Sequence, residues 1–126
     1  MDSTLSVIKA ISDKNRLRIF CALLVHDELC ACQITEFLQV AGATASRHLS
    51  QMVNAGVLQN RKQGRWIYFR ISSEDPSLSP LFKWVKGKLE NSRQIQKDLA
   101  SLEEILRIPC EDLSRKQRRS GTCTKS

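Results

Sequence analysis

The sequence predicts a mainly α-helical (α+β) fold in which a helix-turn-helix is followed by one β-hairpin. Three observations predict it. Apolar side chains recur at helical spacing in residues 33–38 and 44–54, with Gly42 between the two segments. After Gly56 the pattern changes, and side chains alternate as they do in strands. Gly64 divides the alternating stretch, as the turn of a hairpin does. Such a unit is a winged helix-turn-helix, with the hairpin as its wing.

The length and composition suit a single globular domain. The chain has 126 residues, of which 41% are hydrophobic and 26% charged. No apolar run approaches the roughly 20 residues that a membrane-spanning helix needs. The N-terminus, MDSTLSVIKAIS, lacks the basic segment and apolar block of a signal peptide. We therefore expect a cytoplasmic protein.

Two helices are predicted before the helix-turn-helix. Residues 4–11 carry apolar side chains on one face and form a short amphipathic helix. Asp13 then suits an N-cap, because its side-chain oxygen can accept hydrogen bonds from free backbone N–H groups. The second helix covers residues 14–25, and its apolar stripe consists of Leu17, Phe20, Cys21, Leu24 and Val25.

The helix-turn-helix and the wing follow. Gly42 supplies the turn, Thr44 or a close neighbour caps the fourth helix, and Gly56 ends that helix because glycine accepts a positive φ. Strands at residues 57–61 and 66–72 form the wing. One hairpin is too little sheet to be stable alone, so it must pack on the helices.

A single long helix is predicted from Leu81 to Ile108, after a polar connector. Its apolar seam steps by four and three residues as in a coiled coil, with two polar interruptions: Leu81, Val85, Lys88, Ser92, Ile95, Leu99, Leu102 and Leu106. We interpret it as a dimerisation helix; packing within its own protomer is the alternative. Pro109 stops it. Residues 1–110 would be the folded domain, and residues 111–126 a basic, disordered tail.

Positive charge is concentrated in two segments of this chain, whose formal charge is +7. Residues 37–73 hold five basic residues and no acidic one, and residues 114–126 do the same. This distribution favours a polyanionic partner, because neutralising phosphates releases counterions. Together with a helix-turn-helix it predicts binding to double-stranded DNA.

The predicted DNA contacts lie at two places. The second helix of a helix-turn-helix enters the major groove, and its first turn contacts the bases. Here that turn offers Thr44, Ser46, Arg47 and His48. At the wing tip, Lys62 and Arg65 suit flanking phosphates or a minor groove.

Five cysteines are present, and an odd number argues against a complete set of disulfides. Cys30 and Cys32 form a Cys-x-Cys pair, for which metal or redox chemistry is the better interpretation. Residues i and i+2 of a helix face ~200° apart, whereas in an extended segment they face the same side. The two sulfur atoms can therefore hold one ion only if residues 29–32 are unwound or can unwind. We interpret this as a switch that would shift the following helices.

Three motifs together resemble the ArsR/SmtB family, and most of all its arsenite-responsive repressors. They are Glu28-Leu-Cys-Ala-Cys-Gln-Ile, Ser46-Arg-His-Leu, and Arg61-Lys-Gln-Gly-Arg-Trp-Ile-Tyr-Phe-Arg. The likeness covers roughly residues 5–72 well and the final helix loosely. The resemblance implies a homodimer that binds a palindromic operator and leaves it when a metalloid binds.

The chain departs from that family at one ligand. Arsenite repressors of this type use Cys-x-Cys-x-x-Cys, and the third position here is Thr35. As(III) or Sb(III) prefers three thiolates, so Cys110 is the first candidate for the third, with Cys123 and Cys21 behind it. A two-cysteine site is the remaining possibility.

The cysteine pair is also compatible with two other functions. Zn or Cd could be the ion sensed, although zinc usually takes four ligands with histidine among them, and the only histidines are His26 and His48. A thiol redox sensor would release DNA through a disulfide instead. Neither a catalytic triad nor a phosphate-binding glycine loop can be placed, so an enzyme is not expected.

Overall fold

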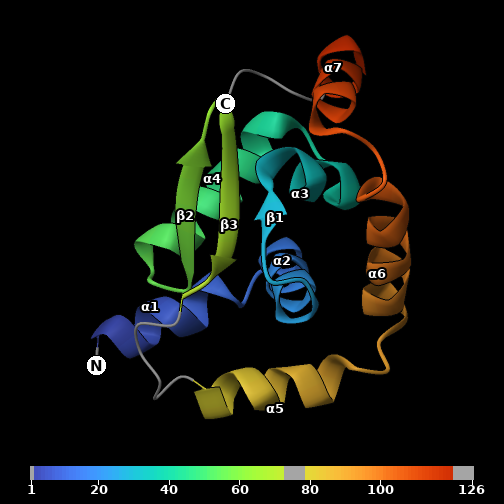
Figure 1. Ribbon diagram of the computed structural model, residues 1–126. Coiled ribbons are helices and arrows are strands. Elements are labelled where there is room, and N and C mark those ends of the chain that lie inside the picture. Colours follow the sequence, from blue (N-terminus) through green and yellow to red (C-terminus); the bar gives the residue numbers. More distant parts are fainter. Residues whose placement is uncertain (1, 73–78, 121–126) are drawn as a thin grey trace.

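The computed structural model describes residues 2–72 and 79–120 and confirms the winged helix-turn-helix (Figure 1). Within these residues the order of elements is α1 (Asp2–Ala10), α2 (Lys14–Val25), β1 (Leu29–Cys30), α3 (Ala31–Leu38), α4 (Gly42–Asn54), β2 (Leu58–Gln63), β3 (Trp66–Ile71), α5 (Ser79–Leu89), α6 (Arg93–Ile105) and α7 (Cys110–Ser120). None of the described helices is long and apolar enough to span a bilayer.

The turn between α3 and α4 differs from the prediction. Its left-handed residue is Gln39, with φ of 57°, and Ala41 is the N-cap of α4, so neither Gly42 nor Thr44 plays the expected part. The side-chain amide of Gln39 donates a hydrogen bond of 2.6 Å to the carbonyl of Glu36, which helps hold this turn. The N-cap of α4 therefore lies three residues before Thr44, the residue that the sequence predicts.

The sheet has one strand more than the sequence predicts. β2 and β3 form the expected antiparallel hairpin with Gly64 in its turn, and Gly56 takes the predicted positive φ. β1 adds to the other edge of β3, so the strand order is β1-β3-β2. Cys30 lies opposite Tyr68 in this pairing. The residues just before α3 are thus part of the same sheet as the wing.

The core lies where α2, α3 and α4 meet the sheet, and α6 packs on α2 and α3. Its largest fully buried side chains include Phe20, Ile34, Met52, Leu58 and Leu102. A buried ion pair joins α2 to α6: the Arg18 guanidinium donates two hydrogen bonds of 2.9 Å to the Asp98 carboxylate. These contacts fix the helices that carry the candidate site.

The predicted long C-terminal helix is two helices. α5 ends at Leu89 and α6 begins at Arg93, and Figure 1 shows them running in different directions. Ser92 is the N-cap of α6, and its hydroxyl accepts a hydrogen bond of 3.4 Å from the Ile95 amide. This polar position of the predicted seam therefore starts a new helix. Ile95 and Leu102 are buried within their own chain. The α6 part of the seam therefore packs inside the protomer at Ile95 and Leu102, while Leu106 is 38% exposed.

The predicted disordered tail is also corrected, because Cys110 to Ser120 form α7. Leu113 is fully buried and Gln117 is 3% exposed, one helical turn apart on the face that packs against α3. Glu111 and Asp112 lie in the first turn, where negative charge suits the helix dipole. Residues 121–126, with Cys123, lie outside the described part of the chain.

Candidate thiolate site and nucleic-acid interface

Three cysteines from separate elements converge beside the wing. Cys30 ends β1, Cys32 lies in the first turn of α3, and Cys110 begins α7. Their sulfur atoms all lie within 4.8 Å of one another, and the Sγ atoms of Cys30 and Cys32 are 3.4 Å apart. In residues 2–72 and 79–120, this is the one group of potential metal-ligating side chains that meets this spacing, and it contains sulfur alone.

The local backbone explains how the pair can face one point. Cys30 is the N-cap of α3 with an extended conformation, φ −76° and ψ 151°, and the helix begins only at Ala31. The Gln33 side chain accepts a hydrogen bond of 2.8 Å from the Cys30 amide and so fixes this cap. The condition set by the sequence is met without any change. The unwinding that we interpreted as a switch is not needed.

The three thiols differ in their pKa values. The Cys32 thiol donates a hydrogen bond to the Cys30 sulfur and lowers the pKa of Cys30 to about 6, against the opposing effect of burial. The same hydrogen bond, together with burial, raises the pKa of Cys32. Burial raises the pKa of Cys110. The lowered pKa of Cys30 favours its thiolate, the form of cysteine that binds a soft cation.

The other candidate ligands are not in this group. Cys21 is buried on α2, where burial, with the nearby Asp98 carboxylate, raises the pKa of its thiol to about 11. It is a core residue, the preferred interpretation of the sequence. Thr35, which stands where a third cysteine was expected, donates its hydroxyl hydrogen to the Ala31 carbonyl at 2.8 Å.

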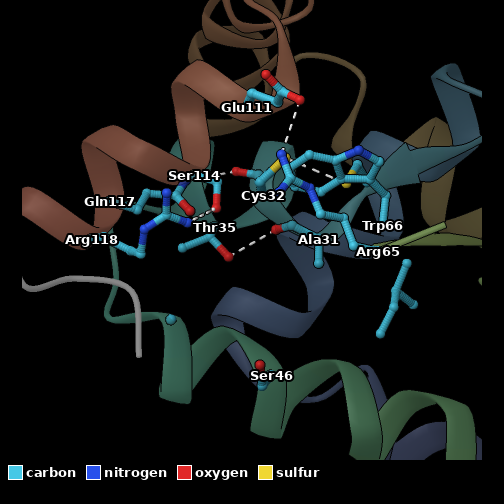
Figure 2. Close-up of a pocket in the computed structure, with 13 residues that line it drawn as sticks. Ala31, Cys32, Thr35, Ser46, Arg65, Trp66, Glu111, Ser114, Gln117 and Arg118 are labelled. Carbon is cyan, nitrogen blue, oxygen red and sulfur yellow. Dashed lines mark hydrogen bonds and ion pairs between the residues drawn. The ribbon is translucent and has the colours of Figure 1, made fainter. Parts of the chain in front are cut away.

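The cysteine pair opens on a pocket of about 940 Å³ between α7, the wing and α4 (Figure 2). Cys30 and Cys32 line it from one side, and Ser46 lines it from the recognition helix. The rest of its wall includes Thr35, Arg65, Trp66, Glu111, Ser114, Gln117 and Arg118. One cavity thus borders both the thiol group and the predicted DNA-reading residues.

At the start of α4 the predicted base-reading residues divide into two kinds. Arg47 is exposed, and Thr44 and Ser46 are partly exposed. His48 is buried, with its Nδ1 atom 3.9 Å from the carboxylate of Asp13, the N-cap of α2. Burial lowers the pKa of His48. A buried imidazole that faces α2 does not suit base contact, so the expectation for His48 is not supported by its position.

The two predicted contact residues at the wing tip, Lys62 and Arg65, are both exposed, but they differ in their partners. Arg65 places its guanidinium 4.8 Å from the centre of the Trp66 ring and forms a 3.0 Å ion pair with Glu111 of α7. For Lys62 no such ion pair is found in the described residues. Sequence reasoning missed Glu111, because it was assigned to the disordered tail. Two acidic residues directly after Pro109 were the available signal for a helix start.

Comparisons with known proteins agree with this architecture. Residues 13–60 match the family model described as bacterial regulatory protein, arsR family. An arsenic resistance transcriptional regulator of Pseudomonas putida is 32% identical over 104 residues, which cover 79% of this chain and 77% of that protein. A cadmium resistance transcriptional regulatory protein homologue of Staphylococcus aureus is 32% identical over 96 residues, covering 76% and 72%.

A solved structure adds a comparison of shape. It is the homodimeric winged helix-turn-helix DNA-binding domain of a possible ArsR-family transcriptional regulator from Mycobacterium bovis. The TM-score is 0.59 and the identity 26%, with 71% of this chain and 80% of that one covered.

Proposed function

Because this chain belongs to the arsR family of bacterial regulatory proteins, we propose that it represses transcription by binding operator DNA as a homodimer, and that As(III) or Sb(III), held by Cys30, Cys32 and Cys110, releases it. Members of this family are transcriptional regulators, so the chain is not an enzyme. The observation that carries the proposal is the convergence of three sulfur atoms within 4.8 Å. Action on DNA would place the protein in the cytoplasm.

The composition of the thiol group supports a trivalent metalloid. Thiolates are soft ligands, and three of them complete the shell that As(III) or Sb(III) prefers. Structural zinc is almost always held by four ligands. Among the described residues, no histidine or carboxylate joins the three sulfur atoms at that spacing. The group therefore favours a three-coordinate ion over zinc.

Exposed side chains support the DNA-binding part of the proposal. Arg47, with Thr44 and Ser46 beside it, offers donors at the start of α4, and Lys62 offers a charge at the wing tip. We propose that the first three contact the major groove and that Lys62 and Arg65 contact flanking phosphates. His48 would instead position α4 through Asp13.

Apolar side chains left exposed on α1 and α5 support a dimer. Leu5 and Ile8 on α1 are 47% and 48% exposed, and Trp84 on α5 is 62% exposed. These helices lie at the end of the molecule opposite α7 (Figure 1). The homodimeric relative from Mycobacterium bovis supports the same assembly. We propose that α1 and α5 form the interface, in place of the α6 seam that is already covered.

Fluorescence anisotropy on duplex DNA from upstream of the gene tests the proposal. The titrant is arsenite in excess reductant, and the proteins are the wild type, Cys110→Ser and a control, Cys21→Ala, which removes a buried thiol outside the group. We expect release of the wild type and the control, and retention of Cys110→Ser. Equal release of all three would limit the site to Cys30 and Cys32. No release of the wild type would refute the metalloid sensor.

Two observations favour a second candidate function, which is that of a redox sensor or a Zn/Cd sensor with the same fold. The low pKa of Cys30 makes it a reactive thiol, and one matched relative is named for cadmium resistance. Release on mild oxidation, reversed by dithiothreitol, would identify redox sensing. Release by cadmium or zinc but not by arsenite, under reducing conditions, would identify a divalent-metal sensor.

A further inference from the structure

Helix α7 joins the thiol group to the wing. Its first residue, Cys110, belongs to the thiol group, and the next, Glu111, forms the 3.0 Å ion pair with Arg65. Farther along α7, the side-chain amide of Gln117 donates a hydrogen bond of 2.8 Å to the backbone carbonyl of Cys32. Lys116 forms an ion pair of 2.6 Å with Glu36 of α3. These contacts tie α7 to the thiol group, to α3 and to the wing.

The same helix borders the surface that DNA would approach. Ser114, Gln117 and Arg118 on α7 face Ser46 on α4 across the 940 Å³ pocket, and Figure 2 shows this opposed arrangement. Glu111 also places a carboxylate against the wing arginine. A phosphate at Arg65 would meet that negative charge, and like charges brought together disfavour binding. A phosphate that binds Arg65 would therefore have to compete with Glu111 of docked α7.

Apolar burial contributes little to the docking of α7. Among its described side chains, Leu113 is the apolar one that is fully buried, and Arg115, Lys116 and Arg118 are exposed. An isolated helix of about this length is marginal in water, so α7 would lose its helical structure on leaving α3. Elements with few buried apolar contacts open locally at a small cost in free energy, and elements that move during regulation are typically of this type.

We propose that α7, residues 110–120, is a latch that must leave the wing before the protein binds DNA tightly. Docked, it occupies Arg65 through Glu111. Released, it frees Arg65 and makes the exposed Arg115, Lys116 and Arg118 of α7 available for phosphate contacts. The link to the inducer rests on the proposed function: joining Cys110 to Cys30 and Cys32 would tie down the first residue of α7 and so favour the docked state.

The test compares Glu111→Gln with Asp112→Asn. Both remove one negative charge from the first turn of α7, but Asp112 pairs only with Arg115 of its own helix, at 3.4 Å, in the structure described. In the absence of arsenite, we expect Glu111→Gln to bind operator DNA about two- to fivefold more tightly than Asp112→Asn, the range of an exposed ion pair. Its response to arsenite should shrink by a similar factor.

A double-mutant cycle assigns this effect to Arg65. In an Arg65→Ala background, Glu111→Gln should no longer change DNA affinity, because its partner is gone. Equal affinities of Glu111→Gln and Asp112→Asn in the unaltered background would overturn the latch. So would a full Glu111→Gln effect in the absence of Arg65, because the gain would then be general electrostatics.

Amide hydrogen exchange of residues 111–118 supplies a readout independent of affinity. We expect faster exchange on DNA and slower exchange with arsenite than in the free protein. Leu113→Ala, which loosens docking without altering charge, should speed exchange in α7 alone and tighten DNA binding. Equal protection of α7 on and off DNA would overturn the latch. Failure of arsenite to release the wild type would refute the inducer instead, while the arsenite-free comparisons still decide the latch.

Discussion

The Cys32 thiol donates its hydrogen to the Cys30 sulfur across 3.4 Å, so one cysteine of the pair stabilises the negative charge of the other. Replacing Cys32 with alanine removes this donor and should raise the pKa of Cys30 from about 6 to the ordinary thiol range, about 8.5, or above. Ultraviolet thiolate absorbance as a function of pH measures this change. Cys21→Ala, outside the group, should keep the low transition. A thiolate that still titrates near pH 6 in Cys32→Ala would contradict the assignment.

The ion pair between Arg18 and Asp98 should be costly to break. Both side chains are nearly buried, and Asp98→Ala would leave the guanidinium charged and unpaired between α2 and α6. We expect a loss of about 3–5 kcal/mol in the free energy of unfolding, measured by urea denaturation. Glu104→Ala on the same helix removes an exposed carboxylate and should cost under about 0.5 kcal/mol. Similar losses for both variants would mean that the buried ion pair contributes no more to the free energy of unfolding than an exposed one.

Lys62 at the wing tip should contribute affinity without specificity. Lys62→Ala should weaken binding to every DNA sequence alike and lower the slope of log K against log salt by ~1, as expected for one lost phosphate contact. Anisotropy at several salt concentrations measures the slope. Lys97→Ala removes an exposed lysine of α6, so the change in net charge is the same, and it should leave the slope unchanged. Identical slopes for the two variants would exclude Lys62 from the contact surface.

Burial of His48 should make the fold acid-sensitive. Burial lowers the pKa of His48 in the folded state, against the attraction of Asp13. The unfolded chain then takes up a proton near pH 6.5, before the folded chain does, so stability falls as pH drops through that value. Urea unfolding between about pH 5 and 7.5 should show a smaller decline for His48→Gln than for the wild type. His26→Gln is the control. If stability falls with pH as steeply in His48→Gln as in the wild type, His48 is not the cause of the acid sensitivity.

The elements with strong local signals could be predicted from the sequence. The apolar stripes of α2, α3 and α4 repeat at helical spacing, and the positive φ of Gly56 and Gly64 follows from glycine's lack of a Cβ atom. The Cys30–Cys32–Cys110 grouping was also the first choice among the candidates. It combined a local pair with a cysteine placed just after a helix stop.

The elements that depend on distant partners could not be predicted. Strand β1 has two residues, too few to show alternation, and exists because it pairs with β3. Helix α7 has a single fully buried apolar residue, Leu113, and is held largely by polar contacts to α3 and the wing. The break before α6 had a local signal in Ser92, but the continuous heptad-like spacing concealed it. Gln39 shows that a left-handed turn does not require glycine.

The origin of all three thiols in one chain has a genetic consequence. Suppose that one allele lacks Cys30, that another lacks Cys110, and that both are expressed in the same cell. If a site were built across two subunits, their mixed dimer would regain one intact set of ligands, and the two alleles would complement each other. Because Cys30, Cys32 and Cys110 meet within a single protomer, every subunit of such a dimer would lack one sulfur atom of the proposed site. The two alleles should therefore fail to complement, and the cell should remain unable to induce.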